Sequence, residues 1–329
     1  LHLAYKAIEE GKITKDTFIK ILPRHTGKNI PYGSSLMYLE AGYSITFFDL
    51  MKGAALPSGN DAVYLIAETL AGSIEQFVVL MNREAQLLGL HQTHFIEPTG
   101  LSEKNFSNAY ELAQFAVYYI KAHPYALKEL HNLPSATVQL YGSKNTKTLT
   151  LKSTNDLLLS FEGCDGLKTG YIRESGYNFI TTAQRGNTRF VLVTLGGKNG
   201  TLERTKTAES LLNWAFSNWE TIEFPRDKLG KVRVWYGKEQ YIKPIMNPSQ
   251  FVTIEKVYKA NLTYKVIYEE LTAPITRGQQ VGKLLLISDT IIVKTIPLLA
   301  PEDIPQGNLV IRIRDFFLKF LYILFKKPE

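Results

Sequence analysis

The spacing of apolar residues changes at Phe224-Pro225, and this change limits the possible folds more than any other feature of the sequence. Before that point, apolar residues recur at helical spacing in several segments, and three strong strand signals follow them. After it, helical spacing is absent until residue 309, and short alternating runs such as residues 262–266 take over. The pattern predicts an α+β domain, then a small all-β domain, then one terminal helix.

The first region divides into a helical cluster and an antiparallel sheet. Gly11 is a natural stop for a helix over residues 1–10, Thr46 followed by Asp49 marks another helix start, and Asn108 with Glu111 forms a capping box. Helices are expected over 1–10, 46–56, 61–70, 73–88, 108–122 and 202–216. The helix over 73–88 has an expected apolar face of Phe77, Val78, Leu80, Met81, Leu87 and Leu88. Strands are expected over 136–140, 147–151, 166–170, 178–183 and 189–195.

Composition and charge exclude several classes of protein. The chain has 329 residues, of which 45% are apolar and 21% charged, so it is globular and long enough for about two domains. Its net charge of +7 fits nucleic acid, anionic lipid or an acidic polymer, but no basic run is interleaved with aromatic residues, so we expect no nucleic-acid partner. The single cysteine, Cys164, excludes an intrachain disulfide and is expected to be a small buried residue. His91 and His94 have metal-like spacing but lie in an expected loop, so we predict no metal site.

The segment from Asn308 to Lys327 is expected to form an amphipathic helix. Its longest uncharged run, residues 320–325, is too short to span a bilayer. One stripe is polar, with Arg312, Asp315, Lys319, Tyr322 and Lys326. The opposite face is apolar, with Ile313, Phe316, Phe317, Phe320, Leu321, Leu324 and Phe325. We expect residues 309–327 to bind an anionic membrane surface, after a loop at 300–307 that would let the helix swing free; the alternative is a helix packed on its own protein.

Two short motifs carry the chemistry. Lys168 places an ammonium group within an apolar strand and begins the sequence Lys-Thr-Gly at 168–170. Ser58-Gly59-Asn60 follows a helix about 110 residues earlier. Each motif alone is weak, because three-residue patterns occur by chance. Their order and their setting, one on a loop after a helix and one on the first of three strands, make the combination more specific.

These two motifs resemble those of the penicillin-interacting serine acyltransferases. Further segments of the sequence resemble the D-alanyl-D-alanine carboxypeptidases, the low-molecular-mass penicillin-binding proteins of the bacterial cell wall. The similar segments are 33–39, 58–62, 87–90, 93–95, 100–101, 165–170 and 176–178, and the resemblance covers essentially the whole chain. It implies a β-lactamase/transpeptidase-like catalytic domain over 1–224, a small β-sandwich over 225–305 and an anchoring helix over 306–329.

The resemblance also assigns roles to single residues. It implies that the lysine supplies positive charge facing the nucleophile, that the loop serine relays a proton and that its asparagine binds a substrate amide. The catalytic residues expected on this basis are Ser58, Asn60 and Lys168. The substrate-binding residues expected are Gly59, Thr169, Gly170 and Arg204, of which the threonine and the arginine would hold the terminal carboxylate of the substrate. No cofactor is implied.

The third motif of the family, Ser-x-x-Lys, does not occur before Ser58. The helix over 1–10 resembles the later turns of the helix that opens with that motif, and it has no N-cap residue. We therefore expect the nucleophile a few residues before Leu1, and the sequence to be either N-terminally truncated or a degenerate homologue.

The resemblance leaves three functions open. The first is removal of the terminal D-alanine from peptidoglycan stem peptides through an acyl-enzyme, with β-lactam antibiotics as covalent inhibitors. The second is a non-catalytic, membrane-associated binder of cell-wall peptides. The third is a β-lactamase. Two features argue against it: the β-domain that follows the first region, and the lack of a Glu-x-x-x-Asn segment at a position suited to deacylation. The expected location is the outer, periplasmic face of the bacterial cytoplasmic membrane.

Overall fold

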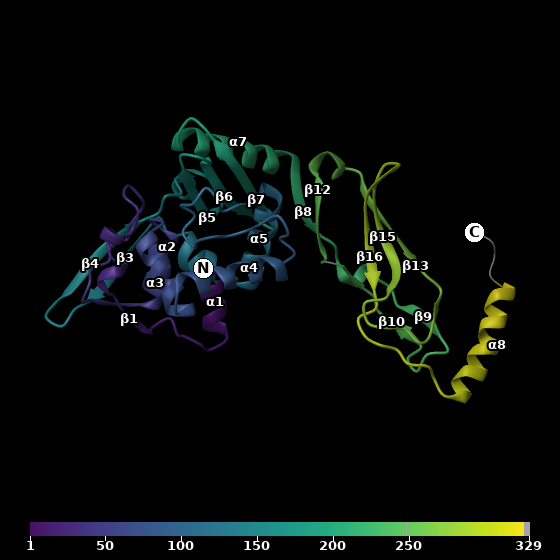
Figure 1. Cartoon of the computed structure of the whole chain (residues 1–329). Helices are drawn as coiled ribbons and strands as arrows, with labels where there is room; N and C mark the ends of the chain where they lie inside the picture. Colours follow the sequence, from purple (N-terminus) through teal and green to yellow (C-terminus); the bar gives the residue numbers. More distant parts are fainter. Residues whose placement is uncertain (248, 326–329) are drawn as a thin grey trace. The chain divides into compact units, whose positions relative to one another are not determined.

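A computed structural model describes residues 1–247 and 249–325. The chain forms two compact units, the first over Leu1–Ala215 and the second from Phe216 onward (Figure 1). The architecture is α+β followed by a β-domain and a C-terminal helix, as the sequence predicts. Among the described residues, no single helix combines the length and the apolar composition that a membrane crossing needs.

The first unit combines a helical cluster with two antiparallel sheets. Its helices are α1 (His2–Glu9), α2 (Phe47–Ala55), α3 (Asn60–Ala71), α4 (Ile74–Leu87), α5 (Ala109–Ala122), α6 (Leu157–Ser160) and α7 (Thr201–Asn218), which runs across the unit boundary, with short turns η1 (Pro23–His25), η2 (Gly27–Asn29) and the π-helical η3 (Leu127–His131). One sheet has the order β5 (Cys164–Ile172), β6 (Gly176–Arg185), β7 (Thr188–Gly197). The other has the order β1 (Phe18–Lys20), β2 (Ser44–Thr46), β3 (Ser135–Tyr141), β4 (Thr146–Lys152). Figure 1 shows α7 on one side of the sheet β5–β7 and the other helices of the cluster on its opposite side.

Two helix starts follow from their capping residues. The hydroxyl of Thr46 accepts a hydrogen bond from the backbone N–H of Asp49 at 3.2 Å, and the side chain of Asn108 accepts one from Glu111 at 2.9 Å. Each cap satisfies an amide group that would otherwise have no partner in the first turn. The predicted starts of α2 and α5 are therefore confirmed. The carboxylate of Glu111 does not close a capping box, because it accepts instead from the backbone N–H of Gln92 at 2.8 Å.

The apolar face predicted for α4 is partly wrong. Phe77 is buried, together with Ala85, whereas Leu80 and Leu87 are exposed. In an α-helix of 3.6 residues per turn, Leu80 and Leu87 lie to one side of the stripe centred on Phe77. The surface that α4 buries is therefore narrower than the apolar content of its sequence indicates.

The second unit has its own apolar core and is built almost entirely of short strands. Its sheets are β8 (Trp219–Glu223) with β12 (Phe251–Glu255); β10 (Tyr241–Ile242), β9 (Val232–Trp235) and β14 (Leu271–Thr272); and β11 (Ile245–Met246), β16 (Ile291–Leu299), β15 (Gln280–Ser288) and β13 (Leu262–Tyr268). Two single turns, η4 (Arg226–Lys228) and η5 (Lys256–Tyr258), connect strands. β8 pairs along its whole length with β12, so this unit includes residues that precede the change of pattern at 224.

The terminal helix α8 (Leu309–Phe325) has a long exposed apolar face, and Asp315 is its one buried residue among those described. Asp315 is fully buried and accepts hydrogen bonds from Arg233 Nη2 at 2.9 Å and from the backbone N–H of Tyr236 at 2.8 Å. Lys319 forms a 2.7 Å ion pair with Glu270. The polar stripe thus contacts the β-domain, whereas we expected a helix that swings free; the stripe residue Lys326, and Lys327, lie outside the described residues.

The apolar side chains on the other side of α8 are at least 40% exposed. They include Leu309, Val310, Ile313, Phe316, Phe317, Phe320, Leu321, Ile323, Leu324 and Phe325. So many exposed apolar side chains on one helix form a patch of the kind that marks an interaction surface.

Candidate active site

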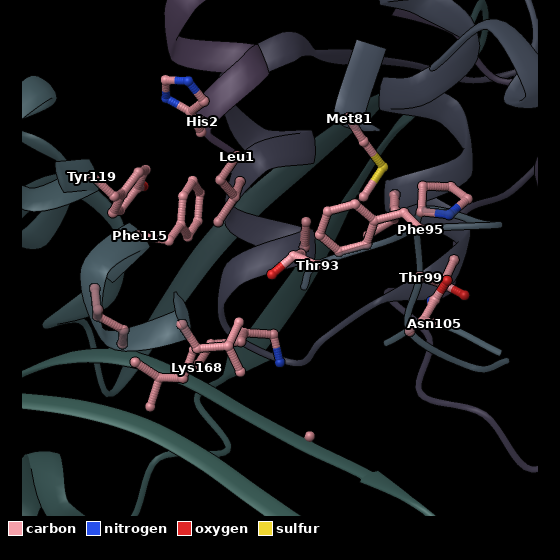
Figure 2. A pocket seen from close by; sticks show the side chains of 18 of the residues that line it. Leu1, His2, Met81, Thr93, Phe95, Thr99, Asn105, Phe115, Tyr119 and Lys168 are labelled. Carbon is pink, nitrogen blue, oxygen red and sulfur yellow. The ribbon is translucent and has the colours of Figure 1, made fainter. Parts of the chain in front are cut away.

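Both predicted motifs lie on one cavity of the first unit. The cavity has a volume of about 530 Å³ and is lined by residues of α1, α3, α4, α5 and β5 and by the loop over 95–105 (Figure 2). Of the predicted site residues, the cavity lining contains Ser58, Asn60, Lys168, Thr169 and Gly170. Gly59 and Arg204 are not part of the lining.

Lys168 connects the two motifs directly. Its Nζ donates a hydrogen bond to Ser58 Oγ at 2.7 Å and another to the backbone carbonyl of Thr169 at 2.7 Å. Among the described residues, no carboxylate forms an ion pair with it. Burial, with a smaller contribution from the positive charge of Arg204, lowers the pKa of Lys168 from 10.5 to about 8. The site therefore holds an ammonium group close to its titration point, and among the described residues its hydrogen-bond partners are neutral oxygens.

The turn that presents Ser58 is held in an unusual backbone conformation. Ser58 has a φ of +60°, in the left-handed region that few non-glycine residues adopt. Gly59 is required next to it, because a Cβ atom there would lie 2.7 Å from the backbone nitrogen of Met37. Asp61 is fully buried and accepts hydrogen bonds from the backbone N–H groups of Met37 at 2.8 Å and Leu39 at 3.0 Å. Strain of this kind persists only where surrounding contacts fix it, and here the backbone N–H groups of Gly59 and Asn60 donate to the carbonyls of Gly53 and Ser35, each at 2.9 Å.

Thr169 faces a second group of polar side chains. Its hydroxyl lies 2.6 Å from the hydroxyl of Thr154, whose backbone carbonyl accepts a hydrogen bond from Arg204 Nη2 at 3.3 Å. Arg204 is buried beside the ring of Phe179, and its Nε has no hydrogen-bond partner among the described residues. Burial lowers the pKa of Arg204. An arginine with an unused N–H, bonded to the backbone of a threonine whose hydroxyl contacts Thr169, is suited to bind a carboxylate.

A neutral histidine supports the strand that carries Lys168. His131 is buried, and its Nδ1 donates to the carbonyl of Leu167 at 3.2 Å while Nε2 accepts from the hydroxyl of Tyr119 at 2.9 Å. Burial lowers the pKa of His131 to about 4, so the ring stays neutral at physiological pH. Nothing in the local sequence marked His131, because its partners lie on α5 and β5.

One wall of the cavity is a loop organised by a single carboxylate. Glu97 accepts hydrogen bonds from the backbone N–H groups of Thr99 at 2.6 Å and Gly100 at 2.8 Å and from the amide of Asn105 at 2.5 Å. Figure 2 shows Thr99 and Asn105 close together on this wall, with Lys168 at another side of the cavity. Within residues 1–247 and 249–325, no three His, Cys, Asp or Glu side chains are grouped so as to hold a metal ion.

Comparison with known proteins gives matches over almost the whole chain. The family model described as D-alanyl-D-alanine carboxypeptidase matches residues 1–199, and the one described as penicillin-binding protein 5, C-terminal domain, matches residues 224–306. The D-alanyl-D-alanine carboxypeptidase DacF of Bacillus subtilis is 33% identical over 314 residues, which is 94% of this chain and 78% of the relative. DacD of Escherichia coli is 31% identical over 95% of this chain and 80% of its own length.

Solved structures give the same result. Penicillin binding protein 5 from Haemophilus influenzae superposes with a TM-score of 0.79 at 27% identity, covering 93% of this chain and 88% of the other. The D-alanyl-D-alanine carboxypeptidase DacD from Francisella tularensis superposes with a TM-score of 0.70 at 26% identity, covering 93% and 86%. Both units of the chain therefore have counterparts in a single known architecture.

Proposed function

The chain belongs to the D-alanyl-D-alanine carboxypeptidase family, and we propose that it removes the terminal D-alanine from peptidoglycan stem peptides through a serine acyl-enzyme. The observation that carries this proposal is the hydrogen bond from Lys168 to Ser58 inside the cavity. It joins a buried ammonium group and a strained serine turn that lie 110 residues apart in the sequence.

In this proposal Lys168 and Ser58 move protons and stabilise charge. The serine that attacks the penultimate D-alanine carbonyl must lose its proton, and the carbonyl oxygen becomes negative in the transition state. A preorganised ammonium group in a site that excludes water stabilises that charge more strongly than it would in bulk solvent. The pKa of about 8 also allows Lys168 to exchange a proton near physiological pH through Ser58 Oγ.

The substrate is held by groups around the proton-transfer pair. Asn60 lines the cavity beside Ser58 and offers an amide that can bind the peptide bond of the substrate. Gly170 lets the substrate backbone lie close along the edge of β5. Thr169 and Arg204 bind the terminal carboxylate of the stem peptide, and the free Nε of Arg204 supports that role.

The nucleophile in this proposal lies on polypeptide that leads into α1. Leu1, His2 and Leu3 line the same cavity as Lys168, and Figure 2 shows Leu1 and Lys168 on different sides of it. Because a helix advances about 5.4 Å per turn, a Ser-x-x-Lys motif one to two helical turns before Leu1 would lie close to this part of the cavity lining.

The same proposal assigns tasks to the rest of the chain. Residues 1–224 form the catalytic domain, residues 225–305 form a β-sandwich, and residues 306–329 form an anchor. The exposed apolar side chains of α8 support its insertion into the interface of an anionic bilayer. From residue 216 on, the sequence has 17 Lys and Arg but 12 Asp and Glu, which favours an anionic surface. The protein would then work on the outer face of the cytoplasmic membrane.

Covalent labelling by a fluorescent penicillin tests the proposal. We expect a chain that carries Ser-x-x-Lys before Leu1 to be labelled, and residues 1–329 alone to remain unlabelled. Labelling of residues 1–329 alone would mean that the nucleophile has been misplaced. An extended chain that binds a D-Ala-D-Ala peptide but is never acylated would be a cell-wall peptide binder, and one that releases hydrolysed penicillin rapidly but no D-alanine would be a β-lactamase.

A further inference from the structure

Four side chains form a row at one wall of the cavity, with two buried histidines at its centre, a largely buried Glu84 at one end and an exposed Glu9 at the other. His2 on α1 and His123 after α5 are 7% and 2% exposed, and His2 Nδ1 lies 2.7 Å from His123 Nε2. The outer nitrogen of each ring faces a carboxylate: His2 Nε2 lies 2.9 Å from Glu84 Oε1, and His123 Nδ1 lies 2.7 Å from Glu9 Oε1. The row therefore crosses three helices, with Glu84 on α4, His2 and Glu9 on α1, and His123 at the end of α5.

The distances fix the number of protons in this row. An ionised carboxylate only accepts hydrogen bonds, so the outer nitrogen of each histidine must carry a proton. The inner pair of nitrogens lies at hydrogen-bond distance, so one of the two must also carry a proton and the other must offer a lone pair. Three protons on four ring nitrogens make one neutral imidazole and one imidazolium.

We propose that His2 and His123 share a single proton and act as positioning residues that hold the first turn of α1 against α4 and α5. His2 and Leu1 also line the cavity, so the same contact sets where the chain enters the site. This inference goes beyond the proposed function, because it concerns how one wall of the cavity is held in place and needs no particular reaction.

The surrounding charges are consistent with one positive charge in the row. Lys6 donates to the second oxygen of Glu84 at 2.7 Å. Tyr5 stacks on His123 with ring centroids 5.1 Å apart, and its hydroxyl donates to Glu129, which also pairs with Lys15. Tyr118 and Tyr119 also face the row.

The burial of His2 decides which of the two histidine rings is neutral. Burial lowers the pKa of His2, and the charge of His123 lowers it further, although the hydrogen bond and the charge of Glu84 oppose them. His2 is therefore the neutral ring, protonated on Nε2 and accepting at Nδ1. His123 is then the imidazolium and donates through both of its N–H groups.

Acid should weaken this contact. A second proton on His2 would remove the lone pair that accepts from His123 and would place two cations side by side. Because the pKa of His2 is lower in the folded chain than in the unfolded chain, the unfolded chain binds more protons as the pH falls from about 6.5. On the acid side, the contact begins to weaken below about pH 6.5 and is lost as the pH falls through the lowered pKa of His2.

Nitrogen NMR of the histidine rings in residues 1–329 tests the proton count. At neutral pH we expect one buried ring to carry protons on both nitrogens, the other to carry one on Nε2, and a low-field proton that couples to nitrogens of both rings. The substitutions His2→Gln and His123→Gln assign the signals. Two neutral rings, each with one proton, would overturn the proposal even if neither variant folded.

Unfolding by urea as a function of pH separates this role from ordinary packing. His2→Gln keeps an acceptor toward His123 and a donor toward Glu84 but cannot take up a proton. As the pH falls below about 6.5, we expect the wild-type folding equilibrium constant to fall by up to about tenfold per pH unit for this one group, and His2→Gln to lose that part of the dependence. His91→Gln, which removes an exposed histidine, should keep it. Equal pH dependence in wild type and His2→Gln would contradict the shared proton.

Discussion

Lys168 in the first unit is a half-buried charged side chain and Asp315 in the second unit is a fully buried one, and their surroundings are opposite. Asp315 receives hydrogen bonds from Arg233, Arg314 and a backbone N–H group, whereas the ammonium group of Lys168 contacts only a hydroxyl and a carbonyl oxygen in the part of the chain that the structure describes. Burial alone would raise the pKa of Asp315, but these hydrogen bonds and the two guanidinium charges outweigh it and hold the pKa below its ordinary value. No opposing charge on a described residue offsets the effect of burial on Lys168, so the pKa of this lysine falls to about 8.

The difference separates a structural charge from a functional one. A buried charge that is fully paired stabilises one arrangement of the chain and changes little with pH. A buried charge without a counter-ion destabilises the fold and is retained where it performs chemistry. On this basis Asp315 holds α8 on the β-domain, and we propose that Lys168 belongs to the catalytic machinery.

Removing the amino group of Lys168 should have the largest effect. In a chain that carries the nucleophile, we predict that Lys168→Ala slows acylation by penicillin about 10²–10³-fold, because a preorganised charge is lost from the site where charge develops. Stopped-flow or gel-based labelling measures the rate. Lys152→Ala, which changes an exposed lysine on β4, serves as the control and should leave acylation unchanged. An unchanged rate in Lys168→Ala would make this lysine merely structural.

Removing the carboxylate of Asp315 should act on stability only. We predict that Asp315→Ala lowers the free energy of unfolding of the second unit by about 1.5–3 kcal/mol, because two arginines and one backbone amide lose a charged partner. Chemical denaturation followed by tryptophan fluorescence measures it, since Trp235 packs near α8. Asp227→Ala, at an exposed aspartate, should change little, and a similar loss in both variants would remove the special role of Asp315.

Replacing Lys168 by an uncharged residue should raise stability. The folded chain holds Lys168 with a lowered pKa, so stability falls as the pH drops from 10.5 to about 8 and stays lower below that. We predict that Lys168→Met raises the free energy of unfolding of the first unit at pH 7 by on the order of 1–2 kcal/mol, allowing for partial exposure of the side chain. A gain in Lys168→Met that persists unchanged at pH 11, measured by urea denaturation, would show that packing and not charge is the cause.

The smallest free-energy effect per residue is expected for the binding of α8 to a membrane surface. The chain should co-sediment with anionic liposomes through α8, and a chain that ends at Gln306 should not. Each exposed basic residue such as Arg312 contributes about 1 kcal/mol, so added salt should weaken binding, while the apolar face keeps part of it. Equal sedimentation of the two chains would mean that α8 only packs on its own β-domain.

Local signals in the sequence predicted much of the fold and part of the site. The caps at Thr46 and Asn108 and the three strands β5–β7 depend on neighbouring residues, which a sequence displays directly. The Lys-Thr-Gly and Ser-Gly-Asn motifs pointed to the cavity in the same way. The contacts of Asp315 could not be predicted, because its partner Arg233 lies 82 residues earlier and a charged residue on a helix is normally solvated. The π-helical turn that ends in His131 likewise has no local signal.

The titration of Lys168 itself tests the central claim most directly, namely that the cleft holds an ammonium group without a counter-ion against Ser58. Carbon NMR of the lysine Cε signals in residues 1–329, assigned with Lys168→Met, gives the pKa without any nucleophile or substrate. We predict half-titration at a pH of about 8, and a change in that value when Ser58→Ala removes the hydroxyl that accepts its hydrogen bond. A Lys168 signal that titrates at the ordinary value of 10.5 and does not respond to Ser58→Ala would contradict it.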